Sequence, residues 1–417
     1  MKADDINRIF NISESFQLPR RILDVLFSDY KNRILDELMS LGEDLDHDWF
    51  TEYFEENHAN KSKMAQDFTP RAVSDLLAGL LPEAKTVGDV CAGTGGLTIG
   101  YWNRNRDASF ICYEISERAI SLLLLNLTIR NIEGAVFRMD ILTGEVFESY
   151  RLQKGSKYSE LFRDPLEPPK VDIVISNPPY SLKYVGGEDE SRFGEFAGMI
   201  PSNFADHAFI AFALTMSAGR CGFILPHGVL FRANKEGAIR EKLVKDQRIE
   251  TIIGLPGRLF LNTDIPTCVM ILGRSSDLLF IDASSECRKD RKLNVMDPDH
   301  VKKILETAER RSNVKNFAHR ADLQEIETNG FNLNIPRYVN TYTPPEPIDL
   351  NAVAADLLDI DMKLDQTSKD LAKMMGELVT DDPKDSEGIR KYINYLTKRR
   401  RKENGPEQIS FDFGLPD

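Results

Sequence analysis

The middle of the chain alternates short apolar runs with amphipathic stretches. Each apolar run is nearly continuous, as expected for strands that are buried on both faces. The seven runs are Thr86–Val90, Ser109–Tyr113, Ala135–Met139, Val171–Ile175, Cys221–Leu225, Thr251–Leu255 and Thr267–Leu272. Helical patterns separate several of them, at Glu117–Ile129, Ala205–Ser217 and Glu236–Lys245. We therefore expect an α/β fold with a seven-stranded, mostly parallel sheet covered by helices on both faces.

Two stretches of different character flank this middle part. Residues 1–60 carry a helical pattern, clearest between Arg20 and Leu41, where apolar residues recur at spacings of three and four. The sequence TYTPPEPIDL, beginning at Thr341, is typical of an extended connector, and helical, strongly charged sequence follows it. We predict an N-terminal helical segment at 1–60, the α/β domain at 61–340 and a C-terminal linker with helices and a polar tail at 341–417.

Composition limits the classes of protein to consider. The chain has 417 residues, 41% of them hydrophobic, and a net charge of −13, which argues against a broadly basic surface that would hold nucleic acid alone. A local basic cleft or a basic partner remains open. Without a long apolar run or a signal-peptide pattern, the protein is expected to be soluble and cytoplasmic. The five cysteines show no metal-ligand spacing, so we expect no metal.

The ends of the first three predicted strands carry residues that suit a nucleoside pocket. The first strand runs into a glycine-rich loop that comprises Asp89, Gly93, Thr94, Gly95 and Gly96. Glu114 ends the second strand, where a carboxylate can accept hydrogen bonds from ribose hydroxyls, and Asp140 ends the third, where it could meet an adenine amino group. The loop lacks the lysine of a phosphate loop, while Asp89 would suit an ammonium group. This favours S-adenosylmethionine over a dinucleotide.

A further predicted strand ends abruptly at Asn177-Pro178-Pro179-Tyr180. Proline has no backbone N–H, so the chain must leave the sheet there as a stiff loop. Alone, this pattern could be a plain turn that ends a strand. Beside a nucleoside pocket, it offers a side-chain amide, two rigid carbonyls and an aromatic ring to a substrate.

Taken together, these motifs resemble the amino-methylating DNA methyltransferases, and most closely the methylation subunit of type I restriction-modification enzymes. The resemblance covers roughly residues 60–350. Besides the glycine loop and the strand-end acids, it rests on Gln66-Asp67-Phe68-Thr69-Pro70-Arg71, Asn177–Tyr180, Phe223–Phe231 and Phe331–Tyr338. It implies a Rossmann-like S-adenosylmethionine-dependent fold in which Gln66–Arg71 closes over the methionine end of the cofactor. Asp67 and Val90 depart from the family pattern, which has an aromatic residue and often a proline there.

The resemblance also implies a chemistry for the proline loop. The side-chain oxygen of Asn177 and the carbonyl of Pro178 would accept the two N–H bonds of an adenine amino group and turn its lone pair toward the methyl donor. Tyr180 would stack on the base, which must first leave its helix, and Phe260 could form the other side of the stack or be an ordinary core residue. His207 and His227 are not needed as bases.

The resemblance further implies partners. No separate domain for reading DNA sequence is evident, so we expect a specificity subunit flanked by two copies of this chain, and in some systems a restriction subunit. The stripe Val353, Leu357, Ile360, Leu364, Leu371, Met375 and Leu378 could dock on that partner or on the parent domain. Lys398–Lys402 could touch phosphates or be a solvated run. Gln408–Phe413 resembles a sliding-clamp-binding peptide, with a free tail as the alternative.

Three functions remain open from the sequence. The first is methylation of adenine N6 in DNA within a complex. The second is methylation of glutamine in a protein or of guanine in RNA, because those families share an Asn-Pro-Pro-[Tyr/Phe] loop; the elements Gln66–Arg71 and Phe331–Tyr338 speak against it. The third is a catalytically weak DNA-binding subunit, against which the intact loop Asn177–Tyr180 argues.

Overall fold

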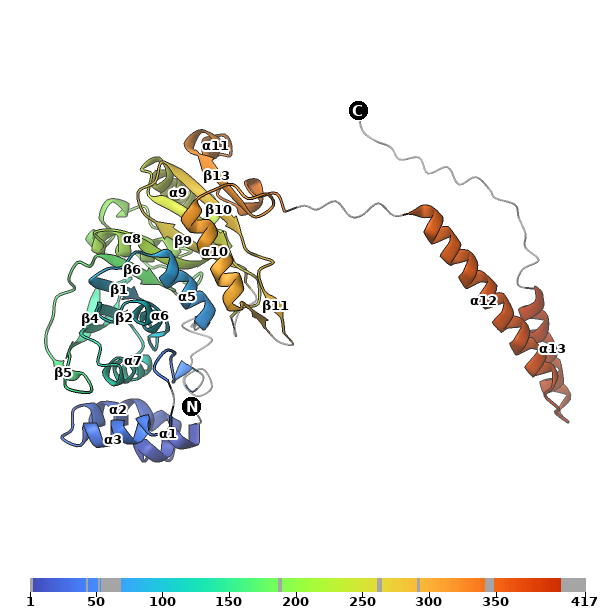
Figure 1. Ribbon diagram of the computed structural model, residues 1–417, viewed down its shortest axis with the longest axis horizontal. Helices are drawn as coiled ribbons and strands as arrows, with labels where there is room; N and C mark the ends of the chain where they lie inside the picture. Colours follow the sequence, from blue (N-terminus) through green and yellow to red (C-terminus); the bar gives the residue numbers. More distant parts are fainter. Residues whose placement is uncertain are drawn as a thin grey trace. The chain divides into compact units, whose positions relative to one another are not determined.

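The computed structural model describes residues 3–42, 44–51, 53, 69–186, 190–260, 265–290, 293–341 and 349–398. They form two compact units, residues 1–342 and residues 343–417. The first unit is built around an 11-stranded sheet of order β13-β10-β8-β9-β7-β6-β1-β2-β3-β4-β5 (Figure 1).

All seven predicted strands are present at the centre of this sheet. They are β1 (Thr86–Val90), β2 (Ser109–Glu114), β3 (Gly134–Asp140), β6 (Ile173–Ser176), β7 (Cys221–Pro226), β8 (Ile249–Gly254) and β9 (Thr267–Leu272). Most of them pair in parallel, but β9 runs antiparallel to both β7 and β8. The predicted α/β class and the mostly parallel central sheet are therefore confirmed.

Additional strands extend both edges of the sheet. They are β4 (Glu145–Gln153) and β5 (Glu160–Arg163) beside β3, and β10 (Asp277–Asp282) and β13 (Ala318–Asp322) beside β8. A separate two-stranded hairpin joins β11 (Arg288–Lys289) to β12 (Asn294–Val295). The edge strands carry charged side chains along exposed positions, so their apolar pattern is weaker than that of the buried centre.

The strand order reverses next to β1. From β1 the chain runs outward through β2 and β3 on one side, and β6 then pairs on the other side of β1 and is followed by β7. Ligands of open α/β sheets bind at such a switch point, beyond the carboxyl ends of the strands. The ends of β1, β2, β3 and β6 all open at this edge, which places the predicted motifs together.

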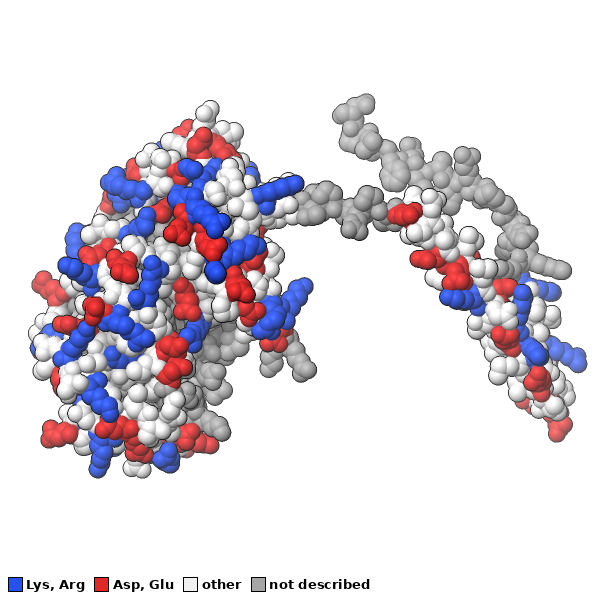
Figure 2. Space-filling model, in the orientation of Figure 1, with Lys and Arg blue, Asp and Glu red and all other residues white. Residues whose placement is uncertain are grey.

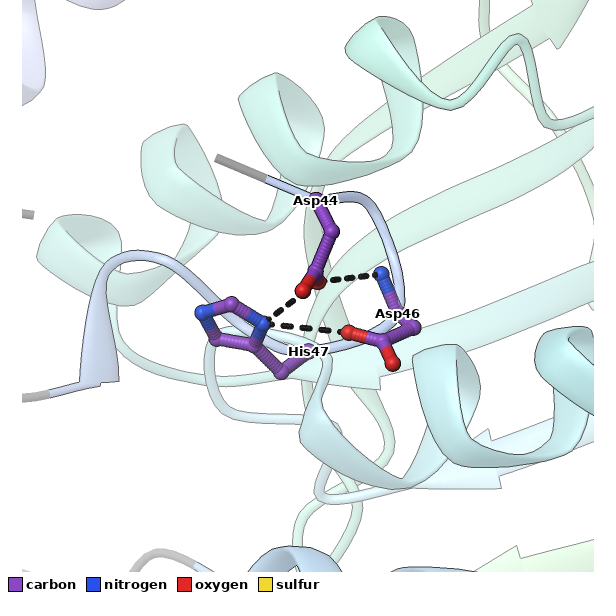
Figure 3. Close-up of side chains that lie close together, drawn as sticks. All are labelled: Asp44, Asp46 and His47. Atoms are coloured by element: carbon purple, nitrogen blue, oxygen red, sulfur yellow. Dashed lines mark hydrogen bonds and ion pairs between the residues drawn. The ribbon is translucent and has the colours of Figure 1, made fainter. Parts of the chain in front are cut away.

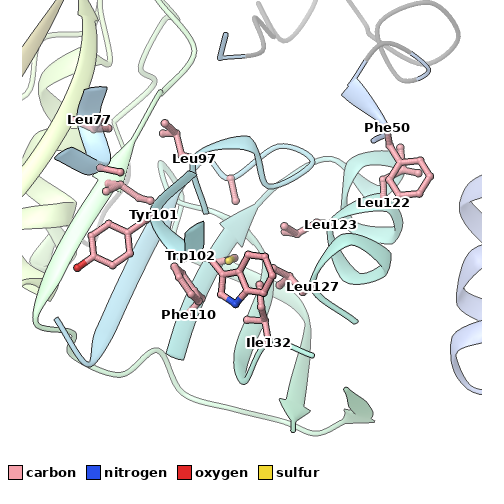
Figure 4. Packing of buried hydrophobic residues seen from close by; sticks show 14 of the residues in the cluster. Phe50, Leu77, Leu97, Tyr101, Trp102, Phe110, Leu122, Leu123, Leu127 and Ile132 are labelled. Carbon is pink, nitrogen blue, oxygen red and sulfur yellow. The ribbon is translucent and has the colours of Figure 1, made fainter. Parts of the chain in front are cut away.

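Helices cover both faces of the sheet and create two apolar cores. One core involves α5 (Arg71–Leu80), α6 (Gly96–Arg104), α7 (Glu117–Ile129) and α10 (Pro298–Arg310), and Figure 4 shows its packing around Tyr101, Trp102 and Phe110. The other involves α8 (Asp206–Met216), α9 (Lys235–Lys245) and α11 (Leu323–Thr328). The sheet is thus buried on both faces, which explains the continuous apolar runs of its central strands.

The N-terminal helices belong to the first compact unit. They are α1 (Ala3–Phe10), α2 (Leu18–Leu26) and α3 (Lys31–Met39), and α2 packs against α7. At the start of α3, the buried ammonium group of Lys31 donates to the carbonyl of Ser159 at 3.0 Å and to Glu160 Oε2 at 2.8 Å. The N-terminal helices therefore contact the sheet domain through both apolar packing and an ion pair.

The described part of the second unit consists of two helices that pack on each other, α12 (Leu350–Gly376) and α13 (Pro383–Lys398). In the predicted apolar stripe, Met375 is half-buried, and the other six side chains are exposed: Val353, Leu357, Ile360, Leu364, Leu371 and Leu378. None of the helices that the structure describes is long and apolar enough to cross a membrane. The predicted basic run Lys398–Lys402 is described only at Lys398.

Positive and negative side chains are interspersed over the face of the protein that Figure 2 shows. Figure 2 shows Lys and Arg interspersed with Asp and Glu on this face, without one broad basic area. This agrees with the net charge of −13.

Candidate active site

A pocket lies at the carboxyl edge of the sheet, where β1, β2, β3 and β6 end. Its polar lining comes from the three strand-end motifs and the proline loop, and its apolar lining from side chains beside them. The lining residues are Thr51, Thr69, Cys91, Ala92, Gly93, Gly96, Leu97, Tyr113, Glu114, Ile115, Met139, Asp140, Ile141, Leu142, Asn177, Pro178, Pro179, Tyr180, Leu182 and Phe209. One cavity thus brings together part of the predicted cofactor set, namely Thr69, Gly93, Gly96, Glu114, Asp140 and Asn177, and the predicted catalytic loop.

The glycine loop turns sharply between β1 and α6. Gly93 and Gly95 have φ angles of 57° and 101°, in the left-handed region that glycine adopts at little cost. Gly95 is the N-cap of α6, so the first unpaired N–H groups of this helix open close to the pocket. The loop can therefore bring backbone donors near a ligand, as its sequence predicted.

Glu114 is the acid at the end of β2, and it is buried against the loop. Its carboxylate oxygens accept from the N–H of Gly93 at 2.8 Å and from the N–H of Ser116 at 2.7 Å. Burial raises the pKa of this carboxyl group, while these backbone donors act in the opposite direction. The two bonds fix the carboxylate at the pocket wall, and each oxygen retains a lone pair for a ligand hydroxyl.

Asp140 ends β3 at the same wall. Its Oδ1 accepts from the N–H of Leu142 at 2.8 Å, which closes a tight turn beside the pocket. Arg192 holds the other side of this turn through a bond from Nε to the carbonyl of Ile141 at 3.1 Å. The acid and the apolar residues that follow it are therefore held as a rigid unit.

The proline loop begins where β6 leaves the sheet. The buried hydroxyl of Ser176 donates to the carbonyl of Val90 at 2.6 Å, which ties the last residue of β6 to the end of β1. Next to it, the side-chain amide of Asn177 donates to Thr69 Oγ1 at 2.9 Å. Thr69 belongs to the predicted cofactor lid, so the structure joins the lid and the catalytic loop directly.

Tyr180 turns inward in this structure. Its hydroxyl donates to Asn177 Oδ1 at 2.7 Å, and its ring meets Phe260 edge to face with centroids 6.3 Å apart. Both aromatic side chains are buried, and Phe260 does not line the pocket. The predicted stacking of Tyr180 and Phe260 on a base would therefore require these rings to move.

A buried ionic cluster supports the residue after the loop. Ser181 has a left-handed φ of 55°, and its N–H donates to Asp206 Oδ1 at 3.2 Å. Asp206 Oδ2 in turn accepts from Arg232 at 2.9 Å, and Arg232 also reaches Glu236 at 3.2 Å. His207, which was considered as a base, is buried within 3.3 Å of Glu236 and does not line the pocket.

Several predicted cofactor residues lie behind the pocket wall rather than in it. Asp89 is fully buried, and its Oδ2 accepts from both the N–H (3.1 Å) and the hydroxyl (2.6 Å) of Thr98 in the first turn of α6. Burial raises the pKa of Asp89 to about 7. Its Oδ1 has no hydrogen-bond partner within the described part of the chain. Asp89 thus caps a helix, and the pocket lining does not include it as the expected partner of an ammonium group.

The other predicted cofactor residues that do not line the pocket contact neighbouring parts of the fold. Thr94 is fully buried, and its hydroxyl donates to Asp48, while Gly95 caps α6. Pro70 precedes α5, and Arg71 pairs with Asp46 outside the pocket. Gln66, Asp67 and Phe68 lie outside the described residues.

The segment before the lid contains a cluster of potential metal ligands. Figure 3 shows His47 Nδ1 facing Asp44 Oδ1 at 2.8 Å and Asp46 Oδ1 at 3.2 Å. Asp46 also pairs with Arg71. The arrangement is that of an ion-pair cluster at the protein surface, and we assign no metal to it.

Sequence reasoning missed the polar residues that anchor this segment. Asp48, Asn126 and Arg130 join residues 45–51 to the glycine loop and to α7. A signal was present, because Asn126 and Arg130 stand four residues apart in the otherwise apolar stretch LLLLNLTIRN. Polar side chains inside such a run need buried partners.

The chemistry of the pocket fits a nucleoside-containing methyl donor. Two carboxylates, Glu114 and Asp140, line the cavity together with apolar side chains such as Leu97 and Ile141. Neither Lys nor Arg occurs among the described lining residues, so phosphate groups would find no counter-charge there. S-adenosylmethionine, which carries an amino acid in place of phosphates, matches this set.

Comparison with known proteins agrees with the geometry. The N-6 DNA Methylase family matches residues 46–346. The methylase subunit of the type I restriction enzyme MpnII from Mycoplasma pneumoniae is 27% identical over 345 residues, which are 77% of this chain and 61% of that protein. The chain therefore spans less than two thirds of the length of this relative.

Solved structures give the same result. The crystal structure of the methyltransferase subunit of a type I restriction-modification system from Streptococcus thermophilus has 33% identity and a TM-score of 0.58, over 66% of this chain and 59% of that one. A Listeria monocytogenes protein assigned to the class I S-adenosylmethionine-dependent methyltransferases shares the fold, with a TM-score of 0.50, 16% identity and coverage of 73% and 97%. The chain belongs to the N-6 DNA methylase family, as its motifs predicted, and has the fold of the S-adenosylmethionine-dependent methyltransferases.

Proposed function

We propose that this protein transfers a methyl group from S-adenosylmethionine to the N6 amino group of adenine in DNA. The observation that carries this proposal is that Asn177 and Pro178 line the same cavity as Glu114 and Asp140. The two residues whose oxygens would bind an amino group thus line the pocket that suits the methyl donor. The family membership and the fold support the same reaction.

The cofactor would be held from two sides. Glu114 would accept hydrogen bonds from the ribose hydroxyls, and Asp140 would accept one from the adenine amino group. The backbone of Gly93 and Gly96 allows close approach at the glycine loop, and Thr69 stands at the lid side. When bound, S-adenosylmethionine supplies an electrophilic methyl group on a positively charged sulfur.

The proline loop would prepare the target nitrogen. Asn177 Oδ1 and the Pro178 carbonyl would each accept one N–H bond of the target amino group, so that its lone pair becomes available. The Thr69 hydroxyl already fixes the amide of Asn177 at 2.9 Å, which orients its oxygen. Because Tyr180 now donates to that oxygen at 2.7 Å, an entering base would compete with the tyrosine hydroxyl and draw its ring toward a stacking position.

Partners follow from the same proposal. Sequence choice would come from a separate specificity subunit flanked by two copies of this chain, and the exposed apolar side chains of α12 would dock on it in the cytoplasm. A restriction subunit would join in systems that also cleave DNA. Type I relatives support the class of complex, and the copy number and the flipped adenine are part of the proposal.

The proposed sliding-clamp contact involves Gln408–Phe413, which lie outside the described residues. It is tested by titrating a peptide of residues 404–417 with a purified bacterial clamp. Saturable binding that is lost when Phe411 and Phe413 are replaced by alanine would support the contact, and absence of binding would refute it.

The methylation proposal is tested with the chain purified together with its specificity subunit. Labelled methyl transfer to duplex DNA is measured for wild type, Asn177→Ala and the control Asn313→Ala, which changes an exposed asparagine in a surface turn. We expect Asn177→Ala to lower the rate about 100-fold or more, because one of two preorganised acceptors is lost. The control should keep the wild-type rate. Equal rates for Asn177→Ala and wild type would refute the proposed role of the loop.

A further inference from the structure

We infer that Asp48 is a positioning residue for cofactor binding. It holds Thr51 at the pocket wall directly, and it holds the glycine loop there through Thr94 and Asn126. Asp48 precedes the lid in sequence and does not itself line the pocket. The inference rests on the proposed function in one respect, namely that the ligand of this pocket is S-adenosylmethionine.

The carboxylate of Asp48 joins two separate parts of the chain. Within its own segment it accepts from the N–H of Phe50 at 2.9 Å and from the hydroxyl of Thr51 at 2.8 Å. From the sheet domain it accepts the side-chain amide of Asn126 at 2.6 Å and the hydroxyl of Thr94. Hydrogen bonds to a charged acceptor are among the stronger ones, so the carboxylate is a firm junction.

Thr94 is the point where this junction reaches the glycine loop. Its side chain is fully buried and points to Asp48, and its carbonyl accepts from the Asn126 amide at 2.8 Å. The hydroxyl and the carbonyl of Thr94 are therefore both held by residues outside the loop. The flanking residues Gly93 and Gly95 have left-handed φ angles and no side chains, so they contribute little rigidity of their own.

Arg130 completes the junction from α7. It is buried, donates to Asn126 Oδ1 at 2.8 Å and to the carbonyl of Leu45 at 2.9 Å, and also contacts the carbonyl of His47. The first bond orients the Asn126 amide so that its NH₂ group faces Asp48 and Thr94. Burial lowers the pKa of Arg130 to about 10, so at neutral pH it remains a cation near the Asp48 carboxylate.

The junction affects the pocket at two points. Thr51, bound to Asp48, lines the cavity directly. Gly93, next to Thr94, lines it too and donates its N–H to Glu114, the expected ribose acid. If Thr94 is released, the Gly93 N–H and the Glu114 carboxylate are no longer held in fixed positions relative to each other. Asn177 and Pro178, in the proline loop, should keep their positions. The effect should therefore fall on cofactor affinity.

The test measures binding of S-adenosylhomocysteine to the full-length chain by calorimetry. Thr94→Val removes the hydroxyl at nearly constant volume and is expected to weaken binding about tenfold or more, since a hydrogen bond to a charged group is lost. Thr94→Ser restores the donor and should recover most of the affinity. Asp48→Ala should weaken binding at least as much, because it also releases Thr51 and Asn126. The double variant should bind no more weakly than Asp48→Ala alone, because that change already breaks the bond to Thr94.

Two further measurements separate positioning from general damage. Asp44→Asn, which alters an exposed aspartate of the same segment, is the matched control and should bind like wild type. In the complex with the specificity subunit, Thr94→Val should raise KM for S-adenosylmethionine while KM for DNA stays constant. Wild-type affinity in Thr94→Val, or fully additive losses in the double variant, would overturn the inference.

Hydrogen exchange keeps the inference separate from the proposed function. If wild type itself does not bind S-adenosylhomocysteine, the proposed function fails. The amides of Gly93, Gly95 and Gly96 then decide the inference, because their exchange should accelerate in Thr94→Val and not in Asp44→Asn. Unchanged exchange of these amides would contradict the positioning role of Asp48 and Thr94.

Discussion

At the scale of single residues, Asn177 and Tyr180 show how a buried acceptor in the pocket is satisfied from within the loop. The Tyr180 hydroxyl donates to Asn177 Oδ1, the oxygen that the proposed mechanism needs as an acceptor. The Thr69 hydroxyl accepts from the NH₂ group of the same amide. A buried acceptor without a donor would cost free energy, so the bond from Tyr180 stabilises this conformation of the loop. When a target base enters, its amino group would replace the Tyr180 hydroxyl as the hydrogen-bond donor to Asn177 Oδ1.

The first prediction separates the two roles of Tyr180. Tyr180→Phe removes the hydroxyl that competes for Asn177 and keeps the ring, so the methylation rate should stay within about threefold of wild type. Tyr180→Ala removes the ring and its stacking, which is worth about 1–3 kcal/mol per base, and should raise KM for DNA about tenfold or more. Steady-state methylation kinetics measure both. Equal losses in the two variants would show that the hydroxyl, not the ring, is what matters.

The second prediction concerns Asp89, whose pKa burial raises to about 7. In the unfolded chain the pKa of this carboxyl group returns to about 3.9. Between these values the native state binds the proton more tightly, so stability falls as pH rises, by up to about 1.4 kcal/mol per pH unit, and levels off above pH 7. Asp89→Asn cannot titrate, and its free energy of unfolding relative to wild type should increase from pH 5 to pH 8 by about 2–3 kcal/mol.

Denaturant titrations at both pH values measure this change. Asn313→Ala supplies the control, because neither asparagine nor alanine titrates, and its difference from wild type should not vary with pH. A constant difference for Asp89→Asn as well would mean that Asp89 is ionised in the folded protein at pH 5.

Residues of the pocket could be predicted where one short stretch carries the whole signal. Glu114, Asp140 and Asn177 each follow an apolar strand, and the structure brings these three side chains to one cavity. Asp89 and Thr94 belong to the same motif, yet their side chains turn behind the loop. Asp89 contacts Thr98 within the same strand–loop–helix unit, whereas Thr94 contacts positions 48 and 126, which lie 46 and 32 residues away, so no local pattern pairs these positions.

At the scale of secondary-structure elements, the buried strands were predicted best. The bounds of β1, β9 and α7 agree with the prediction, because apolar runs there end at glycine, proline or polar residues. The strands β4 and β13, near the two edges of the sheet, were missed, since charged residues interrupt their apolar pattern. The stretch from Arg20 to Leu41 forms two helices that break after Leu26.

The third prediction addresses the packing of α2 on α7. Ile22 is fully buried in this core, and Ile22→Ala should destabilise the first unit by about 2–5 kcal/mol, because a cavity replaces its side chain. Leu358→Ala on the exposed surface of α12 is the control and should change stability by less than about 0.5 kcal/mol. Denaturant unfolding measures both. A loss near zero for Ile22→Ala would mean that the N-terminal helices do not contribute to the stability of the sheet domain.

At the scale of the whole molecule, the chain divides into two compact units of different character. The pocket lies entirely within the first compact unit, whereas the exposed apolar side chains of α12 belong to the second. Large exposed apolar surfaces on helices usually mark contacts with another protein. This division agrees with an enzyme whose target choice comes from a partner.

The fourth prediction uses this division. A chain that ends at residue 342 should bind S-adenosylhomocysteine with the affinity of the full-length protein, because no pocket residue is removed. It should fail to co-purify with the specificity subunit. A milder variant, in which Leu357 and Leu364 are both replaced by serine, should weaken co-purification while leaving cofactor affinity unchanged. Undiminished co-purification of the shortened chain would place the docking surface in the first unit.

The proposed role of Asn177 and its neighbours in methylating adenine at N6 is tested by nucleoside mass spectrometry of DNA from cells that express the chain together with its specificity subunit. We predict N6-methyladenine that is absent without the chain and absent with Asn177→Ala. Unmodified DNA from cells with the wild-type pair, N4-methylcytosine in place of N6-methyladenine, or undiminished N6-methyladenine with Asn177→Ala would contradict the account.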